Sequence, residues 1–186
     1  MRPSAHIRRA IRWIPVALVA AYGALVGVRV IYPIDHVSLL VHWSEEYAVD
    51  ASLVGAVVRA ESRYRAGAVS PRGAVGLMQI MPETGSWIAE QLGMDDFDPT
   101  RLVEPEVNLR FGTWYLATLL ERFEAPRVAL MAYNAGPSRA EAWIENPEDV
   151  FQETETYVNR VLKSIPVYRF YLAAPWLVRV VLSLPL

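Results

Sequence analysis

An apolar run close to the N-terminus constrains this 186-residue chain more than any other feature. Residues 13–32 are apolar except for one arginine, and about 20 apolar residues are enough for a helix to cross a bilayer. That arginine, Arg29, lies near the end of the run, from where its long side chain can extend to the membrane surface. The run therefore predicts a transmembrane helix, and residues 1–34 are interpreted as a membrane anchor.

Three arginines predict how this helix is oriented. Arg8, Arg9 and Arg12 precede the run, and basic residues are enriched on the cytoplasmic side of membrane helices. The rest of the chain would then lie on the opposite side. A cleavable signal peptide is the alternative, but the run is long for one and lacks a clean Ala-x-Ala cleavage site. A buried core helix is a third reading, which the flanking arginines disfavour.

Composition narrows the class of the remaining chain, which at roughly 150 residues can form one domain with its own core. Hydrophobic residues make up 53% and charged residues 20%, which is typical of a folded protein. The net charge of -2 and the lack of a basic block beyond the first residues argue against a nucleic-acid partner. The chain has no Cys, and its three His lack metal-site spacing, so we expect no disulfide, metal or cofactor.

Hydrophobic periodicity and helix-start signals predict a mainly α domain over residues 35–171. Residues 65–81 are rich in Gly, Ala, Ser and Pro and predict a loop or short hairpin, and residues 93–102 predict a second loop. The apolar tail, 172–186, is either a terminal helix folded back on the domain or a segment lying on the membrane. The expected helices are 36–47, 51–64, 82–92, 105–123, 127–133, 137–145 and 153–165.

Glu61 is the first residue that suggests chemistry. Three valines on its helical face precede it by seven, four and three residues, while Arg59 and Arg63 are expected to point to solvent. Burial among the valines would raise the pKa of the carboxyl, so that it could donate a proton near neutral pH. The plain alternative is a glutamate at a helix end that extends into water. The three valines are Val54, Val57 and Val58.

Three later blocks carry polar residues of the kind that bind sugars. Ser70 and the segment 73–79 combine glycines with Gln79, whose amide could bond a sugar while Met78 packs beside it. In the segment 132–137, Asn134 either caps the next helix or faces a cleft. At the start of the last predicted helix, Glu153 and Tyr157 share one face, although a plain core tyrosine is equally compatible.

Together these blocks resemble the lytic transglycosylases of the soluble-lytic-transglycosylase (SLT) type. The resemblance covers about residues 36–171 and rests on four blocks in family order. It implies a lysozyme-like helical domain, preceded here by the transmembrane helix. The blocks are Glu61-Ser62, Ser70 with Gly73-Ala74-Val75-Gly76-Leu77-Met78-Gln79, Ala132-Tyr133-Asn134-Ala135-Gly136, and Glu153-Thr154 with Tyr157-Val158.

The resemblance implies cleavage of the β-1,4 bond between N-acetylmuramic acid and N-acetylglucosamine in peptidoglycan. Glu61 would protonate the leaving oxygen and then, as a base, deprotonate the muramic-acid 6-hydroxyl, which closes a 1,6-anhydro ring. No motif supplies a second catalytic carboxylate, because the family is thought to use the 2-acetamido group instead. Glu153 would support the site. The implied substrate-binding residues are Ser70, Leu77, Met78, Gln79, Ala132, Tyr133, Asn134 and Tyr157.

The resemblance also places the chain in a bacterial cell envelope, anchored in the inner membrane with its catalytic domain on the periplasmic side. Its expected partners are peptidoglycan glycan strands and the membrane, contacted by the N-terminal helix and, in one reading, by the tail; no protein partner is predicted. Two alternatives remain open. One is a hydrolytic lysozyme on the same fold, and the other is a non-catalytic glycan-binding module of an envelope machine.

Overall fold

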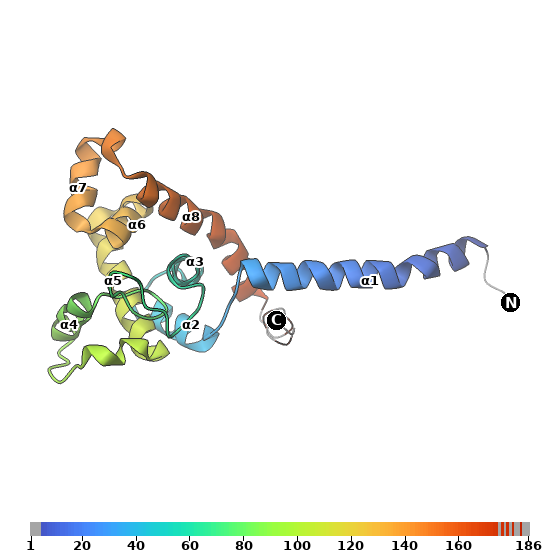
Figure 1. Cartoon of the computed structure of the whole chain (residues 1–186), viewed down its shortest axis with the longest axis horizontal. Helices are drawn as coiled ribbons and strands as arrows, with labels where there is room; N and C mark the ends of the chain where they lie inside the picture. The colour runs from blue at the N-terminus through green and yellow to red at the C-terminus, as the bar shows by residue number, and fades with distance from the viewer. Residues whose placement is uncertain (1–4, 175, 177, 179, 181–182, 184–186) are drawn as a thin grey trace.

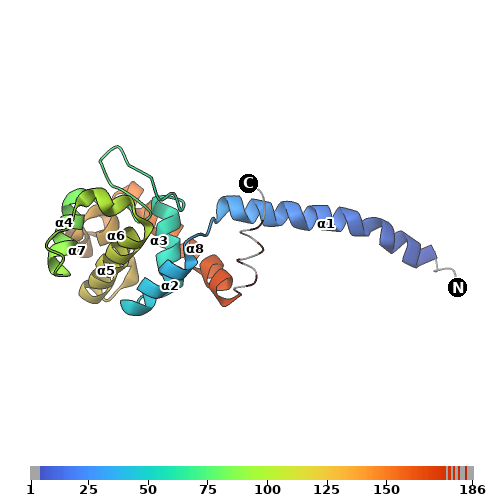
Figure 2. The same ribbon diagram turned by 90° about the horizontal axis from the view of Figure 1, so that it is seen from below.

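The computed structural model describes residues 5–174, 176, 178, 180 and 183, with side chains from Trp13 onward. One long helix, α1, projects as a rod from a group of shorter helices (Figure 1). Figure 2 shows the same separation from below. The elements are α1 (Ala5–Ile31), α2 (Val37–Glu46), α3 (Ala51–Glu61), α4 (Pro82–Gln91), a 3-10 helix η1 (Pro99–Val103), α5 (Pro105–Phe123), α6 (Pro126–Ala135), α7 (Pro137–Glu145), a 3-10 turn η2 (Pro147–Asp149) and α8 (Gln152–Ala173).

Helix α1 includes an apolar stretch, Trp13–Ile31, that is long and apolar enough to cross a membrane. The stretch has 19 residues and a mean hydropathy of 2.0, and none of it is buried against the rest of the described chain. The length and composition of this stretch fit a membrane span, and a signal sequence near the N-terminus has the same properties.

Local signals place most helix starts where the sequence predicts them. Proline occupies the first turn of α4, α5, α6 and α7, where its missing N–H costs no helix hydrogen bond. The side chain of Asp50 caps α3 by accepting a hydrogen bond from the Ser52 N–H at 2.8 Å. The mainly α prediction is confirmed, since the described residues contain helices and only isolated β-bridges.

Helix α3 ends three residues earlier than predicted. Arg63 and Tyr64 follow it with φ of 53° and 63°, a left-handed conformation that is costly for residues with side chains. Two hydrogen bonds made by their side chains offset that cost. The Tyr64 hydroxyl donates to Gly55 O at 3.2 Å, and the Arg63 guanidinium donates to Val30 O at 3.0 Å. The helix therefore stops directly at Glu61.

Arg59 of α3 corrects a second expectation. Arg59 does not point to open solvent, because it donates to Ile31 O and to the Ser164 hydroxyl, each at 2.9 Å. These acceptors lie at the end of α1 and on α8, which no local pattern in α3 reveals. Arg59 therefore connects three helices.

Helix α8 extends past the predicted end at 165 to Ala173 and contains Pro166. A proline inside a helix removes one backbone hydrogen bond, but Tyr168 and Tyr171 beyond it are fully buried and hold the last turns on the core. The contact between α8 and α3 is the most extensive between any two helices of the described chain. The predicted tail, 172–186, lies mostly outside the described residues.

The loop between α3 and α4 is held by a buried asparagine. Asn108 on α5 accepts from Met78 N at 2.7 Å and donates to Val75 O at 2.9 Å and Leu102 O at 2.8 Å. Gly76 lies against it with φ of 85°, and a Cβ there would come within 2.2 Å of Asn108 Nδ2. The loop contains antiparallel bridges from Val75 to Val69 and to Ile80, matching the predicted loop or short hairpin.

We predict that Asn108→Ala destabilises the protein by about 3 kcal/mol, because each of three buried backbone groups loses its partner at a cost of about 1 kcal/mol or more. The melting temperature of the full chain in mild detergent should fall by roughly 6–12 °C. Asn159→Ala is the matched control, since Asn159 is exposed and accepts one bond from Arg127 at 3.3 Å. Equal melting temperatures for the two variants would contradict the role of Asn108.

Candidate active site

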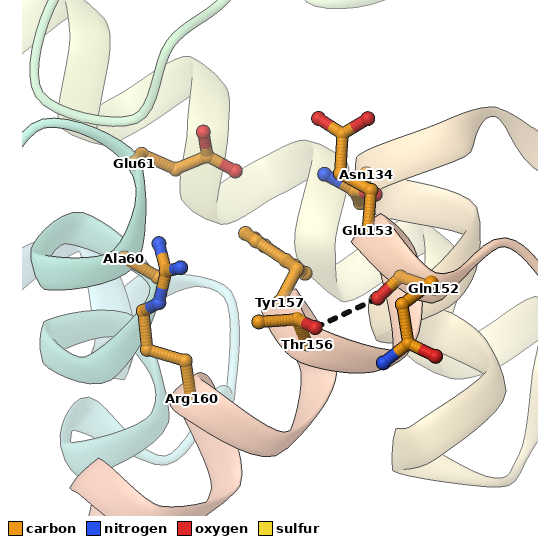
Figure 3. A pocket seen from close by; sticks show the side chains of 8 residues that line it. All are labelled: Ala60, Glu61, Asn134, Gln152, Glu153, Thr156, Tyr157 and Arg160. Atoms are coloured by element: carbon orange, nitrogen blue, oxygen red, sulfur yellow. Dashed lines mark hydrogen bonds between the residues drawn. The ribbon is translucent and has the colours of Figure 1, made fainter.

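Glu61 lies at the last position of α3, between a dry core and a pocket. The preceding turn of the helix contains Val57 and Val58, both fully buried. The carboxyl extends toward the facing helix α8 and reaches a pocket of about 350 Å³ (Figure 3). The pocket is lined by Ala60, Glu61, Asn134, Gln152, Glu153, Thr156, Tyr157 and Arg160.

The surroundings of Glu61 raise its pKa from 4.5 to about 7. Desolvation by the protein around it is the largest cause, because a carboxylate loses more hydration than a neutral carboxyl. Tyr157 and the positive charge of Arg160 act in the opposite direction and keep the pKa from rising further. Glu61 can therefore hold a proton near neutral pH and still release it, which favours the buried reading of this residue over a glutamate that extends into water.

Tyr157 approaches Glu61 from the first turns of α8. Its hydroxyl is buried and has no hydrogen-bond partner within the described part of the chain. It is close enough to lower the pKa of Glu61, although it is not aligned as a hydrogen-bond donor to it. An unpaired buried hydroxyl is costly, so this group is available to a ligand or to the ionised Glu61.

Asn134 closes the other side of the pocket, at the end of α6. Its side-chain oxygen accepts from the Thr154 hydroxyl at 2.9 Å, which ties α6 to α8. The amide NH₂ group is then left to donate toward the pocket. Tyr133, the preceding residue, uses its hydroxyl to bond Met78 O at 2.9 Å and so joins α6 to the loop before α4.

Ser70 and Gln79 shape that loop, and neither lines the pocket around Glu61. The Ser70 hydroxyl accepts from Ala74 N at 3.0 Å, which closes a tight turn. The Gln79 amide donates to Ala68 O at 3.2 Å and Gly76 O at 2.8 Å, and its backbone is left-handed with φ of 50°. Both residues are partly exposed, so a ligand at the loop surface could contact them.

Three residues expected to line the cleft are instead fully buried. Leu77, Met78 and Ala132 have no exposed surface, so their side chains are out of reach of a ligand, and the structure corrects the prediction for them. Met78 packs so closely on Gly112 that a Cβ at the glycine would come within 2.4 Å of its sulfur. The apolar residues of the Gly-Leu-Met-Gln block therefore fix the loop on the core.

The sequence reasoning did not identify Arg160 and Thr156 as pocket residues. Helical spacing contained the signal for Arg160, because residues 153, 157 and 160 lie on one face of a helix at intervals of four and three. Glu153, Tyr157 and Arg160 all line the pocket, as that spacing requires. No group of three or more His, Asp or Glu within the described residues could hold a metal ion.

Comparison with known proteins identifies the family of this chain. Residues 38–155 match the Transglycosylase SLT domain family, and the chain belongs to that family. It is 34% identical over 154 residues to the soluble lytic murein transglycosylase of Salmonella typhimurium, covering 76% of this chain and 24% of that protein. The chain thus spans about a quarter of the length of this relative.

A solved structure and a membrane-bound relative extend the comparison. The lytic transglycosylase Slt of Pseudomonas aeruginosa, solved as an inactive mutant with Gln in place of Glu, superimposes with a TM-score of 0.73 at 32% identity. That match covers 79% of this chain and 26% of the solved chain. The membrane-bound lytic murein transglycosylase C of Actinobacillus pleuropneumoniae is 33% identical over 112 residues, covering 55% of this chain and 31% of that protein. The predicted family and the lysozyme-like helical fold are confirmed.

We predict that Glu61→Gln stabilises the protein in a pH-dependent way. Because the folded pKa is raised from 4.5 to about 7, the wild type loses stability as the pH rises through this window, by up to about 3 kcal/mol. Glutamine does not ionise and escapes that loss. The melting temperature of the variant relative to wild type should therefore increase between pH 4.5 and pH 8.

Glu104→Gln is a control for which we expect a change in stability of the opposite sign. Its hydrogen bond with Arg101 lowers the pKa of Glu104, so removing that charge should cost stability at neutral pH rather than add to it. A melting-temperature difference for Glu61→Gln that stays constant from pH 4.5 to pH 8 would contradict the raised pKa of Glu61.

Proposed function

We propose that this protein is a peptidoglycan lytic transglycosylase. It would cleave the β-1,4 bond between N-acetylmuramic acid and N-acetylglucosamine and leave 1,6-anhydromuramic acid ends. One observation carries the proposal: a carboxyl with a pKa of about 7 lies at the end of a buried helix, facing a polar pocket, in a chain of the SLT family. That carboxyl suits a reaction that begins with proton donation to a leaving group.

Glu61 serves both proton transfers in the proposed reaction. Its proton passes to the glycosidic oxygen as the bond to the anomeric carbon breaks, and the N-acetylglucosamine side leaves as an alcohol. The ionised Glu61 then takes the proton of the muramic-acid 6-hydroxyl, whose oxygen bonds to the anomeric carbon. Glu61 ends protonated, as it began, and no water is consumed.

The residues around Glu61 support each stage. Arg160 and Tyr157 stabilise its ionised form, which the reaction generates between the two proton transfers. Asn134 offers an amide donor to a sugar acetamido or hydroxyl oxygen. Glu153, on the same pocket wall, accepts sugar hydroxyl donors. The loop that borders the cleft is shaped by Ser70 and Gln79 and is bonded to α6 by Tyr133. Buried side chains hold this loop and α6 on the core, namely those of Leu77, Met78 and Ala132.

Hydrolysis on the same fold is a second candidate, and Glu153 is the observation that favours it. It is a second carboxyl lining the pocket of Glu61, and a second carboxylate is what a hydrolytic glycosidase uses to activate water or to stabilise the cationic intermediate. The two candidates differ in their products. Hydrolysis leaves reducing muramic-acid ends that are heavier by one water than anhydro ends.

We further propose that residues 1–34 anchor the enzyme in the inner membrane and that residues 35–171 form its catalytic domain in the periplasm. The exposed apolar stretch of α1 supports the anchor, and the three arginines before it support a cytoplasmic N-terminus. The membrane-bound relative supports an envelope location.

We predict that the full chain releases 1,6-anhydromuramic products from purified sacculi and that Glu61→Gln lowers the rate by about 10²–10⁴-fold, the range associated with losing a general acid. The wild-type rate should fall as the pH rises above about 7, because Glu61 then loses the proton it must donate. Mass spectrometry of the released ends identifies the reaction. Hydrated ends would replace the proposal by hydrolysis, and a Glu61→Gln rate near wild type would remove Glu61 from the mechanism.

We predict a periplasmic catalytic domain that single cysteines can detect, because the native chain has none. In intact cells with a permeabilised outer membrane, a membrane-impermeant maleimide should label Ser138→Cys, on the exposed surface of α7, and should not label Ser4→Cys. Both should react after detergent lysis. Labelling of Ser4→Cys alone would show the opposite orientation of the helix in the membrane. If neither variant is labelled before lysis, both positions lie in the cytoplasm and the proposed orientation is wrong.

A further inference from the structure

The end of α1 is attached to the helix that carries Glu61. Arg59 and Arg63, two positions on either side of Glu61, donate to Ile31 O at 2.9 Å and Val30 O at 3.0 Å. These carbonyl groups belong to the last turn of α1, where a helix lacks its own donors and attracts positive charge. The guanidinium of Arg59 also lies over the ring of Tyr32, 4.3 Å from its centroid.

Helix α8 adds two bonds to this junction. The Tyr168 hydroxyl donates to Pro33 O at 2.6 Å, and the Tyr171 hydroxyl donates to Tyr32 O at 3.4 Å. Four side chains, from α3, the turn after it and α8, thus bind four consecutive carbonyl groups, those of residues 30–33. The membrane helix therefore continues into the domain through a fixed joint rather than through a free linker.

A second pocket opens beside this joint. It has a volume of about 420 Å³, and four arginines and Glu61 are among the residues that line it. Arg65 uses only its Nε, in a 3.0 Å bond to Ser62 O, and the guanidinium of Arg160 makes no hydrogen bond or ion pair with the residues that the structure describes. Several strong donors therefore face the pocket, whose lining is Ile31, Arg59, Ala60, Glu61, Ser62, Arg63, Arg65 and Arg160.

An arginine-lined pocket suits an anion, and the position of this pocket indicates which kind of anion lies near it. Ile31, the last residue of the apolar stretch, is part of the lining, so the pocket lies where an anchored chain leaves the bilayer. Phe170, at the nearby end of α8, is 61% exposed, and Trp176 is 67% exposed; exposed aromatic side chains are typical of the membrane interface. Phosphate groups of lipids occupy this level of the membrane.

We infer that the four-arginine pocket binds a phosphate or diphosphate group of a membrane lipid. Guanidinium groups match phosphate oxygens with paired donors, and a cluster of them near a membrane is typical of headgroup recognition. The inference rests on the proposed anchor and is independent of the cleavage chemistry. Its consequence is that the domain is held against the membrane surface.

The same pocket connects with the cleft. Ala60, Glu61 and Arg160 line both pockets, and Figure 3 shows Arg160 of α8 standing beside Ala60 and below Glu61. A lipid phosphate in the arginine pocket would therefore lie next to the reacting bond. Two sources share this chemistry: an ordinary phospholipid headgroup, and a glycan attached to a prenyl diphosphate, whose sugars could continue into the cleft.

The test titrates the full chain in nonionic detergent with three probes, a short-chain phosphatidylglycerol, farnesyl diphosphate and inorganic pyrophosphate. Affinity is read from tryptophan fluorescence and from adducts in native mass spectrometry. Arg63→Gln combined with Arg65→Gln should weaken binding of the lipid probes by roughly fivefold for each arginine, from about 1 kcal/mol per basic residue at a membrane surface. The tighter of the two lipid probes in wild type identifies the source.

The matched control is Arg122→Gln combined with Arg139→Gln, which removes the same charge from exposed positions on α5 and α7 that do not line the arginine pocket. It should bind like wild type. Arg65→Gln alone, which gives up one hydrogen bond to Ser62 O, replaces the double variant if that variant melts early. Equal affinity in wild type and the pocket variants, or inorganic pyrophosphate binding as tightly as the lipids, overturns the inference.

Peptide carboxylates are the competing ligand, because peptidoglycan strands bear stem peptides. Cleavage of soluble, lipid-free strands with and without stems tests them. If the pocket variants lose cleavage of stem-bearing strands while lipid affinity is unchanged, the pocket binds peptide and not lipid. Lipid affinity is measured without turnover. The lipid-binding inference can therefore fail while the proposed cleavage by Glu61 stands.

Discussion

The structure depends on the burial of one short helix. Every residue of α3 from Ser52 to Val58 is buried, which is unusual for a helix in a domain of this size and leaves only its ends free to act. Asp50 caps one end, and the left-handed Arg63 and Tyr64 stop the other directly after Glu61. Because the helix cannot rotate or slide without exposing its valines, the position of the Glu61 carboxyl is set by core packing.

The last turn of α3 and the residues directly after it serve two surfaces. Glu61 faces the pocket shared with α8, where a dry environment raises its pKa to about 7. Arg59 and Arg63 bind the end of α1, 28 and 33 residues away along the chain. The proposed catalytic group and the proposed membrane anchor are therefore connected by a few rigid contacts. This joint would hold the cleft at a constant height and angle relative to the bilayer.

Sequence alone predicted the features that local chemistry controls. Helix starts followed from proline and from Asp50, because capping and φ restriction act within one turn. The spacing of Val57 and Val58 before Glu61 placed the carboxyl on an apolar face, because helical periodicity determines which side chains share a face. It left open whether the side chain is buried or extends into water. The apolar run of α1 was evident from its length and composition, which can be read without knowing any tertiary contact. The order of the four blocks identified the SLT family, which the comparison confirmed.

The tertiary structure decided what depends on residues distant in sequence. Asn108 holds the loop around Met78 from 30 residues away, and this packing buries Leu77 and Met78 where a motif suggested a binding surface. Arg59 meets Ile31 only because α1 ends beside α3. Helix α8 passes through Pro166 because Tyr168 and Tyr171 bury beyond it. Local propensities cannot contain such contacts, since their free energy arises only when the chain has folded.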